Sequence, residues 1–240
     1  MQRYEILLFD ADNTLFDFTR AEENAFRETA DAAGLDFSDA LYHQYSSIND
    51  GLWKRLEQKE ITLDFLKLER FRVLLTETGR ADDEETLTLA KFMRDTYMNA
   101  LAGQACLIDG AEETCRALAP DYRMYIITNG ISKIQRSRFE KSALTPYFAG
   151  MFVSEELGVS KPSPAYFEKV FDALGNPDKA KVLVIGDSLT SDCDGATDFG
   201  LDFCRFNPKG EPDNGRVFPY TVKKLSEIKT LLDERNGRQI

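Results

Sequence analysis

The sequence predicts an α/β protein: a doubly wound parallel sheet with a second, all-helical subdomain. Three observations predict this fold. Sequence patterns typical of buried strands recur along the chain. Helical patterns separate the later strand patterns, and a long helical stretch follows the first strand pattern. Continuous rather than alternating hydrophobicity is typical of strands buried on both faces. Strands that alternate with helices indicate parallel crossover connections.

Five apolar runs, each followed by turn residues, are the expected strands of this sheet. They are YEILLFD (4–10), RMYIITNG (123–130), GMFVS (150–154), KVLVIGD (181–187) and LDFCRF (201–206). Helical patterns separate or follow the later runs, at 131–142, 162–174, 191–199 and roughly 222–235. We expect the last of these helices to pack on one face of the sheet.

Residues 17–100 interrupt this alternation, because they hold only helical patterns. Thr19 followed by Glu22 is typical of a capping box that opens the first helix. The segment is far longer than an ordinary connection between a strand and a helix. We therefore predict that residues 1–16 and 101–240 form the sheet-containing unit and that residues 17–100 form a separate helical unit.

The helical segment is rich in aromatic side chains, which fit either a hydrophobic core or a surface that stacks on a planar substrate. At helical spacing, a core is the more frequent use of such residues. We expect most of them to pack inside the helical unit. They are Phe18, Phe26, Tyr42, Tyr45, Trp53, Phe65, Phe71 and Phe92.

The composition is that of a globular protein without an export or membrane signal. No apolar run approaches the ~18 residues of a membrane span, and Met1 leads directly into a charged, strand-like start. We therefore expect a cytoplasmic protein. The net charge of −11 and the lack of a basic stripe argue against binding of long nucleic acids. A site for a small anionic substrate would have to supply its own local positive charge.

Four scattered cysteines and a single histidine narrow the possible chemistry. Cys106, Cys115, Cys193 and Cys204 fit reduced, packed thiols rather than a disulfide framework or a zinc site. With His43 as the one histidine, a two-histidine metal site is impossible, and a Ser-His-Asp or Cys-His centre would depend on that residue alone. We expect His43 to have a surface or helix-capping role.

Polar residues gather where the carboxyl ends of the expected strands meet. In open parallel sheets, this edge binds ligands. The first run ends in DADNT, the second in TNG, the loop before the helix at 162–174 carries SKPSP, and the fourth run leads into GDSLTSD. We expect one site at this edge. Its candidate residues are Asp10, Asp12, Thr128, Asn129, Lys161, Asp187 and Asp192.

Phosphoryl transfer to a carboxylate explains this set of residues. Asp10 is the predicted nucleophile and would form an aspartyl-phosphate. At ~4 Å and an effective dielectric of ~20, its repulsion of a phosphate dianion is about 8 kcal/mol, so a cation is required. Oxygen ligands from Asp10, the Asp12 carbonyl and Asp187 suit octahedral Mg²⁺. Lys161 adds a fixed positive charge, and the Thr128 hydroxyl can hold phosphate oxygens. Asp12 is then free to protonate the leaving oxygen and to deprotonate the hydrolytic water.

Each motif has an ordinary structural explanation when it stands alone. A DxD after a strand is often a turn, SKP is common at the start of a helix, and Asp192 alone could cap the helix that follows it. A receiver-type phosphoacceptor is a non-enzymatic alternative, because such domains also arrange acidic residues, a threonine and a lysine around Mg²⁺. They place the acceptor aspartate on the third strand, however, and carry no long helical insert after the first.

Through DADNT, IITN, SKPSP and GDSLTSD, the chain resembles the haloacid dehalogenase-like hydrolase superfamily over essentially its whole length. The resemblance implies a Rossmann-like core with a helical cap inserted after the first motif, Asp10 as nucleophile and Asp12 as acid and base. The phosphoryl-binding residues that it implies are Thr128, Asn129 and Lys161. The magnesium ligands that it implies are Asp10, Asp12 (through its backbone) and Asp187, with Asp192 in support.

Within the superfamily, single residues favour a phosphatase. Dehalogenases lack the second aspartate of the first motif, which is present here as Asp12. Phosphonatases carry a lysine early in the cap, whereas the first cap lysine here is Lys54, and β-phosphoglucomutase-like enzymes carry a cap histidine that residues 19–34 lack. FDADNTLFDF, ITNGISKIQRSRF and GDSLTSD resemble the branch of 5′-nucleotidases that act on pyrimidine and noncanonical nucleoside monophosphates.

The resemblance therefore implies an Mg²⁺-dependent phosphomonoester hydrolase whose partner is a small phosphorylated metabolite, most simply a nucleoside monophosphate. No nucleic acid polymer and no membrane are expected. A phosphatase for another metabolite, such as phosphoglycolate or a sugar phosphate, stays open, because cap residues set specificity. A catalytically idle binding protein is disfavoured, since a binder does not need the proton shuttle that Asp12 would provide.

Overall fold

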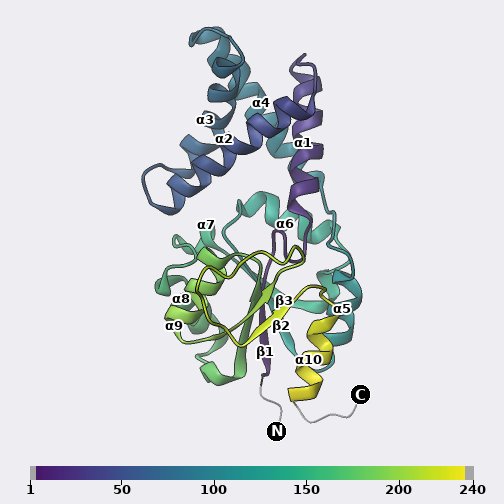
Figure 1. Ribbon diagram of the computed structural model, residues 1–240. Helices are drawn as coiled ribbons and strands as arrows, with labels where there is room; N and C mark the ends of the chain where they lie inside the picture. The colour runs from purple at the N-terminus through teal and green to yellow at the C-terminus, as the bar shows by residue number, and fades with distance from the viewer. Residues whose placement is uncertain (1–3, 236–240) are drawn as a thin grey trace. The chain divides into compact units, whose positions relative to one another are not determined.

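A six-stranded parallel sheet organises the larger unit of the chain (Figure 1). The structure is a computed structural model that describes residues 4–235. The strands lie in the order β3-β2-β1-β4-β5-β6, and every neighbouring pair is parallel. They are β1 (Ile6–Asp10), β2 (Arg123–Thr128), β3 (Phe148–Val153), β4 (Val182–Gly186), β5 (Asp202–Phe206) and β6 (Tyr220–Val222). The predicted doubly wound, Rossmann-like α/β fold is confirmed.

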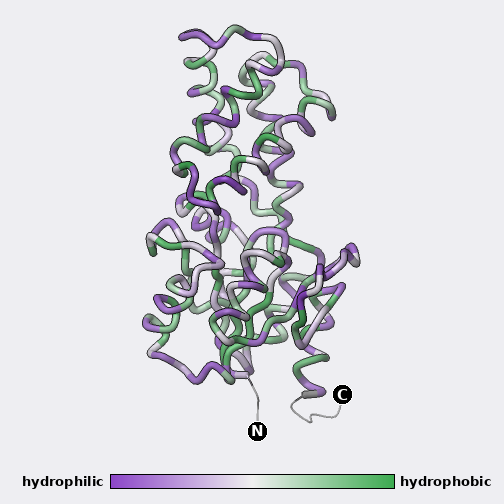
Figure 2. Tube along the Cα trace, turned by 60° about the vertical axis from the view of Figure 1, so that its left-hand side comes forward, coloured by the Kyte–Doolittle hydropathy of each residue, from purple (hydrophilic) through white to green (hydrophobic). Residues whose placement is uncertain are grey.

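Helices cover both faces of this sheet. They are α5 (Ala111–Leu118), α6 (Ser132–Lys141), α7 (Ser154–Leu157), α8 (Pro164–Leu174), α9 (Asp194–Phe199) and α10 (Glu227–Arg235), with short turns η1 (Thr145–Tyr147), η2 (Lys179–Lys181) and η3 (Leu189–Cys193). Leu7 and Phe9 of β1 pack in one cluster with α5 and α10, whereas Ile6 and Leu8 pack in another with α8 and α9. Because both faces are covered, the strands are apolar along their length, as the hydrophobic segments inside this unit in Figure 2 illustrate.

Some elements of this unit differ from the sequence-based expectation. The strand β6 and the helix α5 were not expected, and α10 begins at Glu227 rather than near residue 222. The helix expected over 191–199 consists of the π-helical turn η3 followed by α9. A strand of three residues is too short to show a hydrophobic period, so the sequence around residue 222 predicts a helix instead.

Thr19–Gln104 form the second unit, which consists of four helices (Figure 1). The chain divides after Phe18 and after Gln104, whereas the sequence-based boundaries lie at 16/17 and 100/101. The helices are α1 (Phe18–Ala32), α2 (Asp39–Glu57), α3 (Leu63–Glu77) and α4 (Glu84–Gly103). Side-chain oxygens accept a backbone N–H three residues on at the start of three of them and thereby fix where these helices begin. These capping residues are Ser38, Thr62 and Asp83.

The capping box expected at the start of α1 is wrong. The helix begins at Phe18, so Thr19 lies in its first turn rather than at the N-cap position. The Glu22 carboxylate instead accepts hydrogen bonds from the Asn49 amide, at 2.8 Å, and from the Tyr42 hydroxyl, at 3.3 Å. Thr19 and Glu22 match the sequence pattern, but the packing of α1 against α2 directs the glutamate into the interior of the unit.

Aromatic rings form much of the core of the helical unit. Phe26 and Tyr45 stack with centroids 4.3 Å apart, and Tyr45 lies 5.5 Å from Phe71 and 5.6 Å from Tyr97. All four side chains are buried. Of the eight aromatic residues named from the sequence, half are buried, namely Phe26, Tyr42, Tyr45 and Phe71, while Phe18 and Trp53 are partly exposed. Phe65 and Phe92, by contrast, are exposed.

The cysteines and the histidine lie where their sequence context suggests. All four cysteines are free thiols, and three of them are buried. His43 is exposed on α2. Among residues 4–235, none of the helices combines the length and the apolar character that a membrane crossing requires.

Candidate active site

Three acidic side chains and one lysine meet at the carboxyl ends of the central strands. Asp10 is the last residue of β1, and Lys161 lies in the loop before α8. The Lys161 Nζ is 2.6 Å from Asp10 Oδ1, 2.7 Å from Asp192 Oδ1 and 3.1 Å from the Ile127 carbonyl oxygen. Asp10, Lys161 and Asp192 are all buried, so these ion pairs form out of contact with bulk water.

The strand order explains why these residues meet. β1 lies between β2 and β4, and Asp10 is in register with Ile127 near the end of β2. Asp187 follows β4 immediately. Parallel strands that start together also end together, so the residues that follow neighbouring strands share one edge of the sheet.

Asp187 and Asp192 are held by the turn that follows β4. The Thr14 hydroxyl donates to Asp187 Oδ1 at 3.2 Å, and the Ser188 N–H donates to Asp192 Oδ2 at 3.2 Å. A Cβ at Gly186 would lie only 2.3 Å from Asp192 Oδ2, so a glycine leaves room for this carboxylate. Asp192 therefore accepts from a residue before it and from Lys161, which is not the geometry of a cap for the following helix.

The cluster carries more negative than positive charge. One oxygen of each of Asp10, Asp187 and Asp192 lies within 4.8 Å of the others, and Lys161 is the ammonium that pairs with two of them. Burial and then the neighbouring Asp192 raise the pKa of Asp10 well above its usual range, against the effect of Lys161. Burial and Asp192 also raise the pKa of Asp187 to about 7. Burial would lower the pKa of Lys161, but Asp10 and Asp192 outweigh it and raise that pKa.

A divalent cation fits this donor set. Three carboxylates with converging oxygens are hard ligands of the kind that Mg²⁺ prefers. When they are ionised, their excess of negative charge in a buried place is costly unless a cation neutralises it. The cluster contains Asp10 and Asp187 of the predicted ligand set together with Asp192, the predicted supporting residue, which also presents a carboxylate oxygen to it.

The second aspartate of the first motif has different partners. Asp12 Oδ1 accepts from Arg138 Nη1 and Asp12 Oδ2 accepts from Gln135 Nε2, each at 2.5 Å. Both partners lie on α6, the helix that follows β2. The Asp12 side chain is about a quarter exposed, whereas Asp10 is buried. The two aspartates therefore lie in different environments although they are separated by one residue.

Thr128 and Asn129 position the loops of the site. The Thr128 hydroxyl accepts from the Gly130 N–H at 3.0 Å. The Asn129 amide donates to the Lys161 carbonyl oxygen at 2.8 Å and accepts from the Lys161 N–H at 2.9 Å. This reciprocal pair fixes the backbone that carries Lys161. Both ends of the Asn129 side-chain amide hold this loop, and phosphate binding by Asn129 stays a prediction.

Sequence reasoning missed four residues that support the site: Thr14, Gln135, Arg138 and Tyr166. The Tyr166 hydroxyl donates to the Phe152 carbonyl oxygen at 2.8 Å and accepts from the Thr128 N–H at 3.1 Å, so it connects α8 with the ends of β2 and β3. Gln135 and Arg138 are three residues apart and therefore lie on one face of α6. This spacing, in a helix that must cover an apolar sheet, was the signal available in the sequence.

Comparison with known proteins agrees with this geometry. A family profile described as haloacid dehalogenase-like hydrolase matches residues 4–200. The chain is 36% identical to the HAD-hydrolase YfnB of Bacillus subtilis over 98% of both chains. It is 35% identical to the pyrimidine 5′-nucleotidase PynA of Streptococcus pneumoniae over 96% of both. It is 30% identical to the pyrimidine 5′-nucleotidase YjjG of Escherichia coli, over 96% of this chain and 98% of that one.

A crystal structure of Bacillus subtilis YfnB bound to magnesium superposes on this chain with a TM-score of 0.87, covering 96% of this chain and 99% of that one. These matches confirm the resemblance that the four motifs indicate. They also confirm the resemblance of the local sequences to the 5′-nucleotidase branch. The chain is an enzyme that belongs to the haloacid dehalogenase-like hydrolase family.

Proposed function

We propose that the chain is an Mg²⁺-dependent phosphomonoester hydrolase whose substrate is a nucleoside 5′-monophosphate with a pyrimidine or noncanonical base. The observation that carries the phosphatase assignment is the convergence of Asp10 with Lys161, Asp187 and Asp192 at the end of β1. The nucleotide assignment draws on two relatives, PynA and YjjG, which are pyrimidine 5′-nucleotidases.

In the first step of the proposed reaction, a carboxylate oxygen of Asp10 attacks phosphorus and the bond from phosphorus to the ester oxygen breaks. The leaving oxygen takes a proton from Asp12. In the second step, water attacks the aspartyl-phosphate, Asp12 takes a proton from that water, and the bond from phosphorus to Asp10 breaks. Inorganic phosphate leaves, and both carboxyl groups return to their starting states.

The remaining residues supply charge and position. The Lys161 Nζ donates to Asp10 Oδ1 at 2.6 Å, and its positive charge favours the ionised form of the nucleophile. Asp10, Asp187 and the Asp12 backbone, with Asp192 in support, would hold Mg²⁺, which would supply positive charge against the repulsion between carboxylate and phosphate. Thr128 and the N–H groups of its loop are the proposed contacts of the phosphoryl oxygens.

The test is the release of inorganic phosphate from dUMP, dTMP, UMP, phosphoglycolate and a sugar phosphate, each with Mg²⁺ and with EDTA. The Asp10→Asn variant serves as the blank. We expect the highest kcat/KM for the nucleotides and no release in EDTA. If the nucleotides are the poorest substrates, the nucleotide assignment is wrong. A single stoichiometric phosphorylation without turnover would indicate a phosphoacceptor instead of a hydrolase.

A further inference from the structure

The Asp12 carboxylate is held at both of its oxygens by one helix. Arg138 Nη1 donates to Oδ1 and Gln135 Nε2 donates to Oδ2, each at 2.5 Å. The two donors are three residues apart on α6. A carboxylate bound through both oxygens has a defined position and a defined orientation, whereas a single contact would leave it free to rotate.

Both donors are themselves buried. Arg138 is fully buried and Gln135 is 2% exposed. The Arg138 guanidinium packs over the Phe16 ring, 4.8 Å from its centroid, and that ring is also buried. A desolvated guanidinium is costly unless it is paired. Asp12 supplies such a pair, so the energetics of burial favour this one arrangement.

The backbone around the pair is shaped to allow it. Asn13 has a φ of 60°, and its N–H donates to the Phe16 carbonyl oxygen at 2.7 Å, which forms the turn that brings Phe16 back beside Asp12. A Cβ at Gly130 would lie 2.1 Å from Gln135 Nε2. A side chain at position 130 would therefore displace the amide from its place on Asp12.

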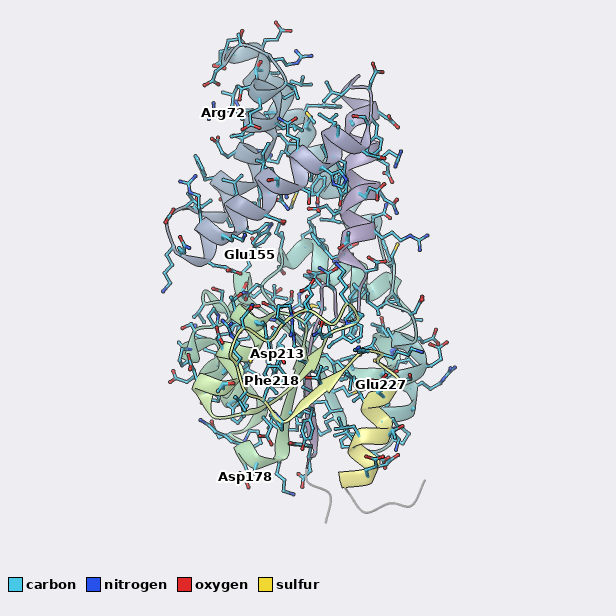
Figure 3. All side chains as sticks on the ribbon, in the orientation of Figure 1. Arg72, Glu155, Asp178, Asp213, Phe218 and Glu227 are labelled. Atoms are coloured by element: carbon cyan, nitrogen blue, oxygen red, sulfur yellow. The ribbon has the colours of Figure 1, made fainter. Side chains whose placement is uncertain are left out.

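The helix that carries the donors is also anchored. The Ser132 N–H at its start donates to Glu155 Oε2 at 2.7 Å, and Glu155 is labelled in Figure 3. Arg136, on the same helix, pairs with Glu156, and both of these side chains are partly exposed. α6 therefore presents one buried arginine to Asp12 and one exposed arginine to α7, which gives a matched pair for experiment.

We propose that Gln135 and Arg138 are positioning residues for Asp12: they hold its carboxylate in the orientation from which it passes a proton to the leaving oxygen. The proposal rests on the proposed function and deepens it. Proton transfer requires the acid within roughly 2.6–3.2 Å of the oxygen that it protonates. A misplacement of about 1 Å in a reacting group can lower a rate by ~10²-fold.

The test compares two classes of leaving group. An alkyl phosphate needs its leaving oxygen protonated, whereas the p-nitrophenolate of p-nitrophenyl phosphate can leave without it. The alkyl substrate is whichever compound of the panel above the wild type hydrolyses best. We expect Arg138→Met to lower kcat/KM for the alkyl phosphate by ~10²-fold and for p-nitrophenyl phosphate by less than about 5-fold. A merely structural role would lower both by the same factor, and that result would overturn the proposal.

A second variant protects the test against misfolding. Gln135→Met removes one donor and keeps the ion pair, and we expect a selective loss of roughly 10-fold for the alkyl phosphate. Arg136→Met is the control on the same helix and should leave both kcat/KM values unchanged. Arg205→Met controls for the loss of a buried arginine, because Arg205 pairs with Asp213, labelled in Figure 3, rather than with Asp12. It should leave the alkyl-to-aryl ratio unchanged.

The Asp12→Ala background separates this proposal from the proposed function. There, Arg138→Met should cause no further loss, because nothing is left to position; a further selective loss would overturn the proposal. If Asp12→Ala itself leaves the alkyl substrate unaffected, the acid role in the proposed function is wrong. If Asp12→Ala is selective but Arg138→Met and Gln135→Met are not, the positioning role alone is wrong.

Discussion

Both units of the chain bury charged side chains, but they balance those charges differently. In the sheet-containing unit, Lys161 pairs with Asp10 and Asp192, and an oxygen of Asp187 lies within 4.8 Å of oxygens of these two carboxylates. In the helical unit, one carboxylate, Glu22, and one guanidinium, Arg70, are joined through Asn49. The Asn49 amide donates to Glu22 Oε1 at 2.8 Å and accepts from Arg70 Nη1 at 3.2 Å.

The balance of charge separates a site from a structural cluster. In the helical unit, the negative and positive groups match, and Arg70 also packs over the Tyr97 ring, 4.4 Å from its centroid. Such a charge-balanced cluster does not need a bound ion to neutralise it. Near Asp10, the carboxylates outnumber the ammonium, and the charge of Asp192 adds to burial in raising the pKa values of Asp10 and Asp187. Buried charge that the protein does not balance indicates a binding site for something that does.

The largest expected effect is the loss of catalysis in Asp10→Asn. We expect the rate of phosphate release to fall by at least ~10⁴-fold, as when the nucleophilic side chain of an enzyme is removed. The free energy of unfolding of the metal-free protein should not fall, because Asp192 continues to pair with Lys161 and one repelling carboxylate is gone. Rates of phosphate release and urea denaturation measure the two quantities.

Asp178→Asn is the matched control for that variant, since Asp178 is an exposed acid that precedes β4 at the other edge of the sheet (Figure 3). It should keep wild-type activity. Activity retained in Asp10→Asn would mean that the nucleophile is misassigned, and a large loss of stability there would mean that the carboxylate is structural, which would remove the contrast between the two units.

The next effect is a loss of stability in the helical unit. Arg70→Met removes the guanidinium that donates to Asn49 Oδ1 and leaves the Glu22 carboxylate without this nearby cation. We expect the free energy of unfolding to fall by about 3 kcal/mol, measured by urea denaturation. Arg94→Met, which breaks a pair with the exposed Asp95, should cost less than about 1 kcal/mol. Equal losses in the two variants would contradict the structural role of the buried cluster of Glu22, Asn49 and Arg70.

The smallest effect is a dependence of stability on pH. Burial is the main cause that raises the pKa of Glu22 from 4.5 to about 7, against the effect of Arg70. Between these values the folded state binds the proton more tightly than the unfolded state. Stability from this group is therefore complete below pH 4.5 and is lost as the pH rises through 7. The shift corresponds to at most about 3 kcal/mol.

Glu22→Gln cannot ionise and should remove this part of the pH dependence. Urea denaturation at pH 5 and pH 8 measures it, and the difference between wild type and variant isolates Glu22 from the carboxylates near Asp10. Glu23→Gln, on the exposed side of the same helix, is the control. An unchanged dependence in Glu22→Gln would show that burial of this carboxylate does not alter its protonation.

The comparison also shows which features were predictable. Long apolar runs predicted five strands of the sheet, and motif order placed Asp10, Lys161 and Asp187 at one edge of it. Both depend on local pattern and on simple rules for parallel sheets. The strand β6 was missed because three residues carry too little pattern. The capping box at Thr19 and Glu22 was wrong because tertiary contacts with Asn49 and Tyr42 decide where that glutamate points.

By itself, the sequence determined the α/β class, the helical insert and the chemical identity of the residues that meet beyond the strands. These follow from hydrophobic period and motif order, which are local properties of the chain. Only the tertiary structure decided that Asn129 holds the Lys161 loop, that Asp192 pairs with Lys161, and that Gln135 and Arg138 hold Asp12. Such pairings join residues as far as 126 positions apart, and hydrogen bonds over that separation depend on how helices pack on the sheet.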